Sequence, residues 1–262
     1  MNAFRQLVSI VLRLRGEQGC PWDRAQTPAS MRPFVLEEAY EVVDAIDRGD
    51  DAELKKELGD VLFQIVLLAR MAEERGVFTI EDVVAGINDK MIVRHPHVFG
   101  DAAADPSASA AEVGLKAWEA RKAKERQHRG SALDGLPLAL PALLRAHRVS
   151  DKAAVVGFDW PDRDSVREKV REELAELDEA IAQDDAEAIG EEFGDLLFSL
   201  VNLGRHLPVG AESALRKATS KFERRFRAIE ASFQAEGRTV HEASMDELEA
   251  RWAEVKSKGE AP

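Results

Sequence analysis

The chain has few of the residues that crosslink a fold or hold it in a membrane. Its 262 residues include one cysteine, Cys20, which excludes a disulfide within the chain and fits a reducing cytoplasm. No apolar run is long enough to cross a bilayer. Arginines interrupt the apolar N-terminal stretch, which favours an amphipathic helix at residues 1–15 over a targeting segment. We therefore expect a cytoplasmic protein with no membrane partner.

Aromatic residues are also scarce, at 6% of the chain, whereas Ala, Glu, Leu and Arg are abundant. This composition favours helix over sheet and predicts an all-α fold. Basic charge is in deficit, because the net charge is −13 and the pI is near 5.1. The deficit argues against a protein that binds DNA or RNA polymers, which would carry a basic face. A small anionic ligand stays possible, because local charge and bound metal decide that case.

One arrangement of acids occurs twice, 135 residues apart. The first copy is Glu37-Glu38-x-x-Glu41 followed by Glu57-x-x-Asp60, and the second is Glu172-Glu173-x-x-Glu176 followed by Glu192-x-x-Asp195. Both copies end in Gly-Asp-x-Leu-Phe, at residues 59–63 and 194–198. Two copies indicate a tandem duplication rather than a solenoid. We expect an N-terminal helical domain at residues 1–127, a linker at 128–140 and a C-terminal domain at 141–262.

Each copy contains a long predicted helix. Asp50 and Asp51 are suitable N-caps for a helix that runs to about residue 75, and the second copy predicts a helix over 186–206. Apolar residues cover more than one face of the first helix, which predicts deep burial, either within the chain or at a subunit contact. Gly59 and Gly194 lie in mid-helix, where glycine costs about 1 kcal/mol relative to alanine. We expect another helix or a ligand to approach the backbone there.

The acid spacing predicts a metal site. Residues three or four apart share a helix face, so Glu38 and Glu41 project together, and Glu57 and Asp60 do the same from the next helix. A short connection at residues 48–50 makes these helices antiparallel neighbours, and the four carboxylates then face one another. Oxygen ligands without histidine favour Mg²⁺, with Mn²⁺ as a substitute. The same reasoning assigns the second set of metal ligands: Glu173, Glu176, Glu192 and Asp195.

A solvated helix face and a di-iron centre fit the acids less well than a magnesium site does. Acidic pairs at helical spacing commonly form a solvated face, but recurrence at one offset favours the metal site. A ferritin-like di-iron bundle needs two Glu-x-x-His pairs, and only Glu125-x-x-His128 has that pattern.

Basic and aromatic residues recur at helical spacing later in each half. Lys221 and Arg225 lie one turn apart and can clamp phosphate oxygens, as can Lys256, while Trp252 offers a ring face to a nucleotide base. Surface ion pairs for the basic residues and a core position for Trp252 are open alternatives. The first half repeats the pattern, which defines a possible second site: Glu37, Lys90, Arg94, Trp118 and Lys122.

Together with the acid motifs, three short segments are diagnostic: CPWD at 20–23, RHPHVF at 94–99 and VGFDW at 156–160. The chain resembles the MazG family of bacterial nucleoside triphosphate pyrophosphohydrolases over nearly its whole length. The resemblance implies two MazG-like helical domains that pack as four-helix-bundle-type units and are completed by a homodimer. It further implies Mg²⁺-dependent cleavage between the α and β phosphates, broad base tolerance and a role in nucleotide-pool sanitation or regulation.

The resemblance also implies roles for individual residues. The C-terminal domain carries the main activity, with metal held by the four acids assigned above. The residues that it places against the nucleotide are Lys169, Glu172, Lys221, Arg225, Trp252 and Lys256. The sequence supports the same half, because Lys169 precedes Glu173 by one turn, whereas the first half has Phe34 at that position.

As a mechanism, we expect a metal-bound water to attack one phosphorus in line, with Glu172 or Glu173 as catalytic carboxylate and Glu172 orienting or deprotonating the water. Two other functions stay open on sequence alone. One is a non-catalytic helical protein that binds metal or a partner. The other is a pyrophosphatase specific for one modified nucleotide.

Overall fold

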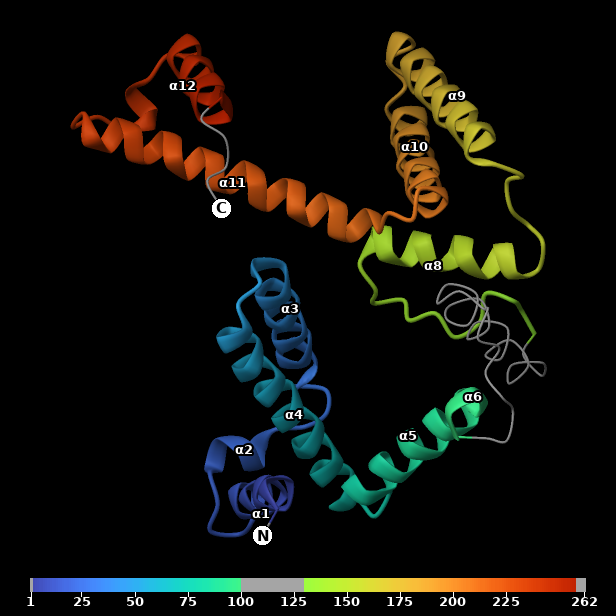
Figure 1. Ribbon diagram of the computed structural model, residues 1–262, viewed down its shortest axis with the longest axis vertical. Helices are drawn as coiled ribbons and strands as arrows, with labels where there is room; N and C mark the ends of the chain where they lie inside the picture. The colour runs from blue at the N-terminus through green and yellow to red at the C-terminus, as the bar shows by residue number, and fades with distance from the viewer. Residues whose placement is uncertain (1, 100–129, 258–262) are drawn as a thin grey trace. The chain divides into compact units, whose positions relative to one another are not determined.

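A computed structural model describes residues 2–99 and 130–257, and within these ranges every regular element is a helix (Figure 1). The all-α prediction is therefore confirmed. The chain divides into two compact units, Met1–Trp118 and Glu119–Pro262, here called unit 1 and unit 2. Residues 130–141 contain turns and no helix. The domain limits at 127 and 141, with a linker at 128–140, stay a prediction.

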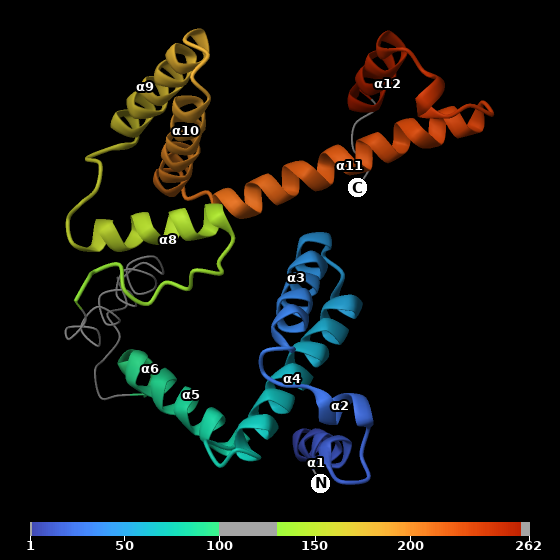
Figure 2. The ribbon, with the colours of Figure 1, turned by 180° about the vertical axis from the view of Figure 1, so that it is seen from behind.

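Unit 1 is built around an antiparallel pair, α3 and α4, with α1 and α2 packed at one end of α4 (Figures 1 and 2). Asp50 caps α4 by accepting a hydrogen bond from the Glu53 backbone N–H, as predicted. Gly49 ends α3 in the left-handed region at φ +68°, which glycine adopts at no steric cost. The helices of unit 1 are α1 Ala3–Arg15, α2 Pro21–Ala25, α3 Arg32–Arg48, α4 Asp51–Glu73, α5 Ile80–Arg94 and α6 Pro96–Phe99.

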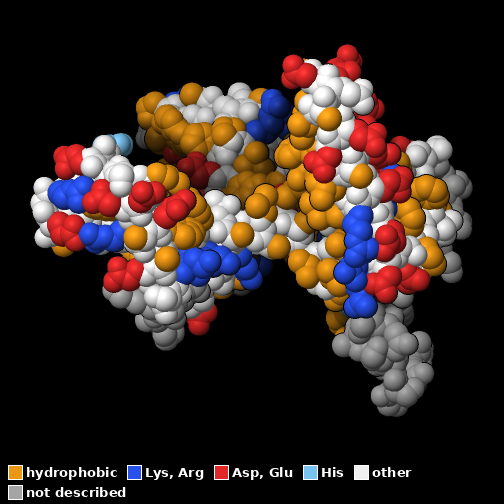
Figure 3. Space-filling model, turned by 90° about the horizontal axis from the view of Figure 1, so that it is seen from above, with side chains coloured by type: hydrophobic (Ala, Val, Ile, Leu, Met, Phe, Trp, Pro, Cys, Tyr) orange, Lys and Arg blue, Asp and Glu red, His pale blue; other side chains and the backbone are white. Residues whose placement is uncertain are grey.

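An apolar core fills the space between α1, α3 and α4. Val11, Met31 and Leu67 are at most 1% exposed, and Phe34 packs against them. Within the single chain α4 is not buried on every face, because Leu58 is 52% exposed; its burial at a subunit contact stays a prediction. Leu62 and Ile65 on the same helix are also exposed. Figure 3 shows such hydrophobic side chains, in orange, lying open on the surface.

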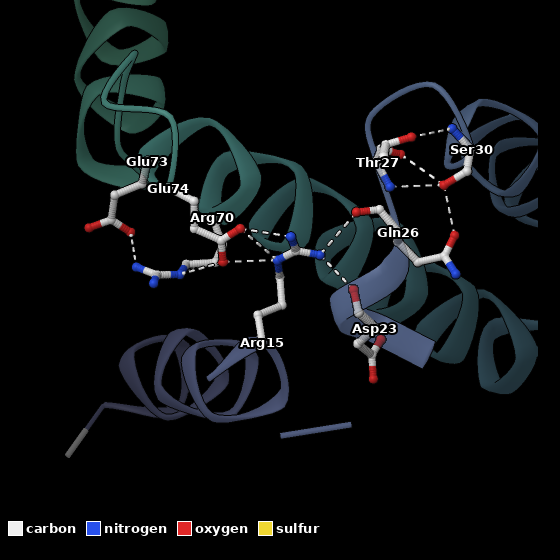
Figure 4. Close-up of polar contacts among 8 residues, drawn as sticks. All are labelled: Arg15, Asp23, Gln26, Thr27, Ser30, Arg70, Glu73 and Glu74. Carbon is white, nitrogen blue, oxygen red and sulfur yellow. Dashed lines mark hydrogen bonds and ion pairs between the residues drawn. The ribbon is translucent and has the colours of Figure 1, made fainter. Parts of the chain in front are cut away.

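A largely buried arginine side chain joins three segments of unit 1 (Figure 4). The Arg15 side chain, 9% exposed, makes a two-pronged ion pair with Glu74 at the end of α4, with Nε–Oε1 2.9 Å and Nη2–Oε2 2.7 Å. Its Nη1 also donates to the backbone carbonyl of Asp23 at 2.5 Å. The planar guanidinium thereby fixes the segment before α3 against α1 and α4.

Unit 2 repeats the hairpin as α9 and α10, with α8 across it, and then extends into α11, against which α12 folds back (Figure 1). Asp185 caps α10 by accepting from the N–H groups of Glu187 and Ala188. The helix predicted at 186–206 is confirmed. The elements of unit 2 are α8 Ala142–Val155, α9 Arg163–Ala182, α10 Ala186–His206, α11 Ala211–Ala235, the 3₁₀ turn η2 Val240–Glu242 and α12 Met245–Ser257.

Among the described residues, none lies close enough to the two mid-helix glycines to explain them. A Cβ added at Gly59 or Gly194 would meet no atom within 4 Å, outside its own helical turn. The expected close approach to the backbone is therefore wrong for contacts within the structure as described.

Candidate metal and nucleotide site

The α3–α4 hairpin brings three acids of the first motif together. Carboxylate oxygens of Glu38, Glu41 and Glu57 lie within 4.8 Å of one another. Partial burial, and then the charge of Asp60, raises the pKa of Glu38 above its ordinary value. Burial, followed by a hydrogen bond to Glu41, raises the pKa of Glu57. The raised pKa values mean that the ionised carboxylates destabilise one another, and a bound cation would relieve this repulsion.

The α9–α10 hairpin gathers the second motif in the same way. Oxygens of Glu173, Glu192 and Asp195 lie within 4.8 Å of one another, and Glu173 is only 6% exposed. Burial raises the pKa of Glu192, and the charge of Glu176 is the next cause. Glu176 therefore lies close enough to act on the cluster, although it is outside the 4.8 Å group. A set of carboxylate oxygens with no histidine fits a hard divalent cation such as Mg²⁺.

Lys169 is the feature that most clearly distinguishes the second cluster. Its Nζ lies 2.8 Å from Oε1 of Glu172 and 2.8 Å from Oε1 of Glu173. The two carboxylates raise the pKa of Lys169 further above its ordinary value of 10.5. The Lys169 ammonium thus lies between the carboxylate of a buried residue, Glu173, and that of an exposed residue, Glu172. Phe34 occupies the matching position in unit 1 and packs against the core.

A cavity of about 790 Å³ opens beside the second cluster. Its walls come from α8, residues 157–160, α9 and α10, together with Leu133. Lys169, Glu173 and Asp195 line it, and so do three buried polar side chains, Ser150, Ser199 and Asn202. Sequence reasoning missed these three. One signal was available: Asn202 stands where the first half has Leu67, in an otherwise apolar register.

The basic residues of the C-terminal region lie on other helices. Lys221 and Arg225 are on α11, and Trp252 and Lys256 are on α12. The Trp252 ring is 5.1 Å from the Phe222 ring and 5.9 Å from the Arg225 guanidinium, measured between centroids and to Cζ respectively. The α11–α12 pair therefore brings Arg225, one residue of the predicted phosphate clamp, close to Trp252. None of these residues lines the described cavity.

The structure describes only some of the residues of the possible second site. Glu37 is exposed on α3, and Lys90 is exposed and Arg94 buried on α5. Trp118 and Lys122 lie outside the described residues, as does the Glu125–His128 pair.

Comparison with known proteins agrees with the duplicated motif. Two stretches, residues 26–99 and 162–229, match the MazG nucleotide pyrophosphohydrolase domain. A Thermotoga maritima protein named nucleoside triphosphate pyrophosphohydrolase/pyrophosphatase MazG is 47% identical over 97% of this chain and 95% of its own length. The nucleoside triphosphate pyrophosphohydrolase of Escherichia coli K12 is 47% identical over 98% of both chains. The counterpart of that name from Mycolicibacterium smegmatis is 40% identical over 53% of this chain and 42% of its own. The chain belongs to the MazG nucleotide pyrophosphohydrolase family.

Proposed function

We propose that this protein hydrolyses nucleoside triphosphates between the α and β phosphates, releasing a nucleoside monophosphate and pyrophosphate. The observation that carries the proposal is full-length identity of 47% to two relatives named for this reaction. The duplicated carboxylate clusters support it independently, because phosphoryl hydrolysis needs a cation to neutralise the phosphates.

We assign the main metal site to unit 2, with Glu173, Glu192 and Asp195 as ligands and Glu176 as the fourth. Three of these acids already present oxygens to a common point. Mg²⁺ is the proposed ion and Mn²⁺ a substitute, since both take carboxylate oxygens. When bound, the ion supplies charge neutralisation and a water of lowered pKa.

The protein's own side chains then divide the remaining tasks. Glu172, exposed beside the ligands, orients the attacking water and accepts its proton. Lys169, which contacts Glu172 and Glu173, would be available to bind phosphate oxygens if a divalent cation were held by Glu173. Lys221, Arg225 and Lys256 hold the charge that develops on the departing pyrophosphate. Trp252 contacts the nucleotide from α12. Its ring also packs against the ring of Phe222.

We further propose that the active form is a homodimer. Large apolar side chains lie open on both helices of the hairpin and on α11, among them Phe193 at 53%, Leu215 at 57% and Phe222 at 54% exposed. A second copy that covers these faces would complete a four-helix packing unit, as apolar helix faces require.

The substrate range follows from the family and not from geometry. We propose ribo- and deoxyribonucleoside triphosphates, standard and aberrant, and a role in nucleotide-pool sanitation or regulation in the cytoplasm. A net charge of −13 argues against DNA or RNA polymers as partners. In the part of the chain that is described, no helix is long and apolar enough to span a membrane.

Unit 1 offers a second metal site, but fewer of its residues fit a catalytic role. Glu38, Glu41 and Glu57 are gathered as in unit 2, and Asp60 is close. Phe34 stands in place of Lys169, so the matching phosphate contact is absent from this position. We assign catalysis to unit 2.

The test is pyrophosphate release from ATP and dITP with Mg²⁺, using two variants at matched positions. Glu173→Ala should abolish release while helix content by circular dichroism is unchanged, and Glu38→Ala should retain most of it. Orthophosphate as the only product, or no product from the wild type, contradicts the proposal. A panel of triphosphates separates broad specificity from action on one modified nucleotide.

A further inference from the structure

We propose that Arg238, Glu247 and Arg251 fix helix α12 in the position from which it contacts the nucleotide, so that all three act as positioning residues. This inference rests on the proposed function, in which Trp252 and Lys256 on α12 bind the substrate. It concerns what holds that helix in place, because the two assigned contacts depend on where the helix lies.

Helix α12 is attached to the rest of unit 2 with little apolar burial. It folds back along α11 after the connection at residues 236–244 (Figures 1 and 2). Among its described residues, Met245–Ser257, no side chain is fully buried, and Leu248, Trp252 and Val255 are only partly covered. Apolar burial is the main force that fixes a helix on its neighbour. Other contacts must therefore set the angle and register of α12 on α11.

A two-pronged ion pair joins the connection to the first turn of α12. Arg238 Nη1 donates to Glu247 Oε1 at 2.9 Å and Nη2 donates to Glu247 Oε2 at 3.2 Å, a geometry that fixes direction as well as distance. Arg238 Nη2 also donates to the backbone carbonyl of Glu242 at 3.2 Å. Glu247 Oε2 accepts from the Ser244 backbone N–H at 2.9 Å. One carboxylate thus satisfies the start of α12 and ties the helix to Arg238.

Two guanidinium groups lie over the ring of Phe233, near the end of α11. The Cζ atoms of Arg238 and Arg251 are 5.3 Å and 4.8 Å from the ring centroid, and Phe233 is 0% exposed. Arg251, on α12, also pairs with Glu236, which directly follows α11. Such cation–π contacts strengthen when the groups are shielded from water. Phe233 therefore provides one platform that links α11, the connection and α12.

The positioning contacts and the nucleotide residues occupy neighbouring lines along α12. Glu247 and Arg251 are four residues apart and share one face of the helix, and Trp252 and Lys256 share the next. Arg251 and Trp252 are adjacent in sequence, so a rotation of α12 that breaks the Arg251 contacts also moves Trp252. The ion pairs and the Phe233 platform thus keep Trp252 beside Arg225 of the phosphate clamp, whose guanidinium is 5.9 Å from the Trp252 ring.

Release of α12 should weaken substrate binding by a predictable route. A substrate that needs the positioned helix binds with an apparent affinity reduced by the fraction of molecules in which the helix is in place. The Arg238 and Glu247 side chains are 35% and 43% exposed, so water screens their pair and limits that reduction. We expect a loss of about three- to tenfold when the pair is broken. The acid cluster on α9 and α10 should keep its metal.

The first experiment is Glu247→Gln. Hydrogen bonds from Arg238, and then from the Ser244 N–H, lower the pKa of Glu247 to about 2, so the wild-type carboxylate is ionised at neutral pH. Glutamine keeps an oxygen that can accept from Ser244 and removes the charge. The kcat/KM for ATP should fall by about three- to tenfold, mainly through KM, with Mg²⁺ binding unchanged in calorimetry. Asp246→Asn removes the same charge from the neighbouring exposed residue of α12 and should leave kcat/KM unchanged.

A second background separates positioning from a general loss of stability. In Trp252→Ala/Lys256→Ala, α12 has lost the assigned substrate contacts, so kcat/KM should fall. Adding Glu247→Gln to that background should lower kcat/KM no further, because residues that act through one another are not additive.

The position of the helix can also be measured directly with two spin labels. In a Cys20→Ser background, Ala231→Cys on α11 and Glu249→Cys on α12 place the labels at exposed positions. The distribution of distances between the labels should broaden when Glu247→Gln is added.

Three results overturn the inference. One is a wild-type kcat/KM or an unchanged distance distribution in Glu247→Gln. Another is an equal loss of kcat/KM from Glu247→Gln with and without Trp252 and Lys256. The third is a wild-type kcat/KM in Trp252→Ala/Lys256→Ala, because α12 then positions no contact. In each case the wild type still releases pyrophosphate, whereas failure of the proposed function shows in the wild type itself, which then releases none.

Discussion

Replacing Lys169 by methionine should strengthen metal binding and weaken catalysis. The Lys169 ammonium makes 2.8 Å contacts with Glu172 and Glu173, and its side chain is 30% exposed. Hydrogen bonds to charged groups contribute about 1.5–3 kcal/mol, and partial exposure reduces this pair to about 2 kcal/mol in total. Loss of the contacts should lower the free energy of unfolding by that amount, since Glu173 is left buried without its cation.

Metal binding must first displace the same ammonium. A variant without Lys169 avoids that cost of about 2 kcal/mol, so its Mg²⁺ affinity in the absence of nucleotide should rise by up to roughly thirtyfold, because 1.4 kcal/mol is a factor of ten. Its kcat/KM should fall, because a phosphate contact is lost. The pKa of Lys169 is raised above 10.5, so on the alkaline side the pair's contribution to stability is fully present up to pH 10.5 and is lost as pH rises through the raised pKa.

Urea denaturation in EDTA and isothermal titration with Mg²⁺ measure the two quantities. The matched control is Arg171→Met on the same helix, whose pair with Glu168 is 60% and 72% exposed and should contribute less than about 0.5 kcal/mol. A fall in Mg²⁺ affinity in Lys169→Met, parallel to its loss of stability, refutes the reasoning that the ammonium and the cation compete for Glu173.

Three further predictions concern other parts of the fold. At a hundred times its Kd and without nucleotide, Mg²⁺ should raise the free energy of unfolding of the wild type by about 2.7 kcal/mol, and therefore raise its Tm. Asp195→Asn should lose this response in scanning calorimetry. Gly194→Ala should stabilise α10 by about 1 kcal/mol in chemical denaturation, since its Cβ meets no atom of the chain; destabilisation instead would reveal a dimer contact there. Glu74→Gln should cost about 1–2 kcal/mol at pH 7. Arg15 lowers the pKa of Glu74, so this cost is present above 4.5 and fades as pH falls through the lowered pKa, while exposed Asp44→Asn changes little.

Local rules were sufficient to predict the helices and the acid clusters. Asp50 and Asp185 indicate where α4 and α10 begin, because a side-chain oxygen of an N-cap residue accepts hydrogen bonds from the first free N–H groups of a helix. The spacing of Glu38, Glu41 and Glu57 brings them together because both helices of a hairpin are regular. These features depend on residues that are close in sequence, and they are found where the pattern predicts them.

The cavity and the exposed apolar faces depend on contacts that periodicity does not encode. Asn202 lines a hollow only because α8 packs across the α9–α10 pair, far away in sequence. Leu58 on α4 has an apolar side chain in a helical register, and that pattern is the same whether the chain itself or a second copy covers the face. The guanidinium of Arg15 was missed for a similar reason, since its partners lie on other segments.

The matched positions 67 and 202 differ between the two units, because Leu67 is buried in an apolar core, whereas Asn202 lines a cavity. Enlarging a side chain at position 202 should disable the enzyme yet leave the protein abundant, whereas shrinking one at position 67 should reduce abundance through misfolding. We therefore expect substitutions in the core of unit 1 to act mainly on stability, and substitutions around the unit 2 cavity to act mainly on activity.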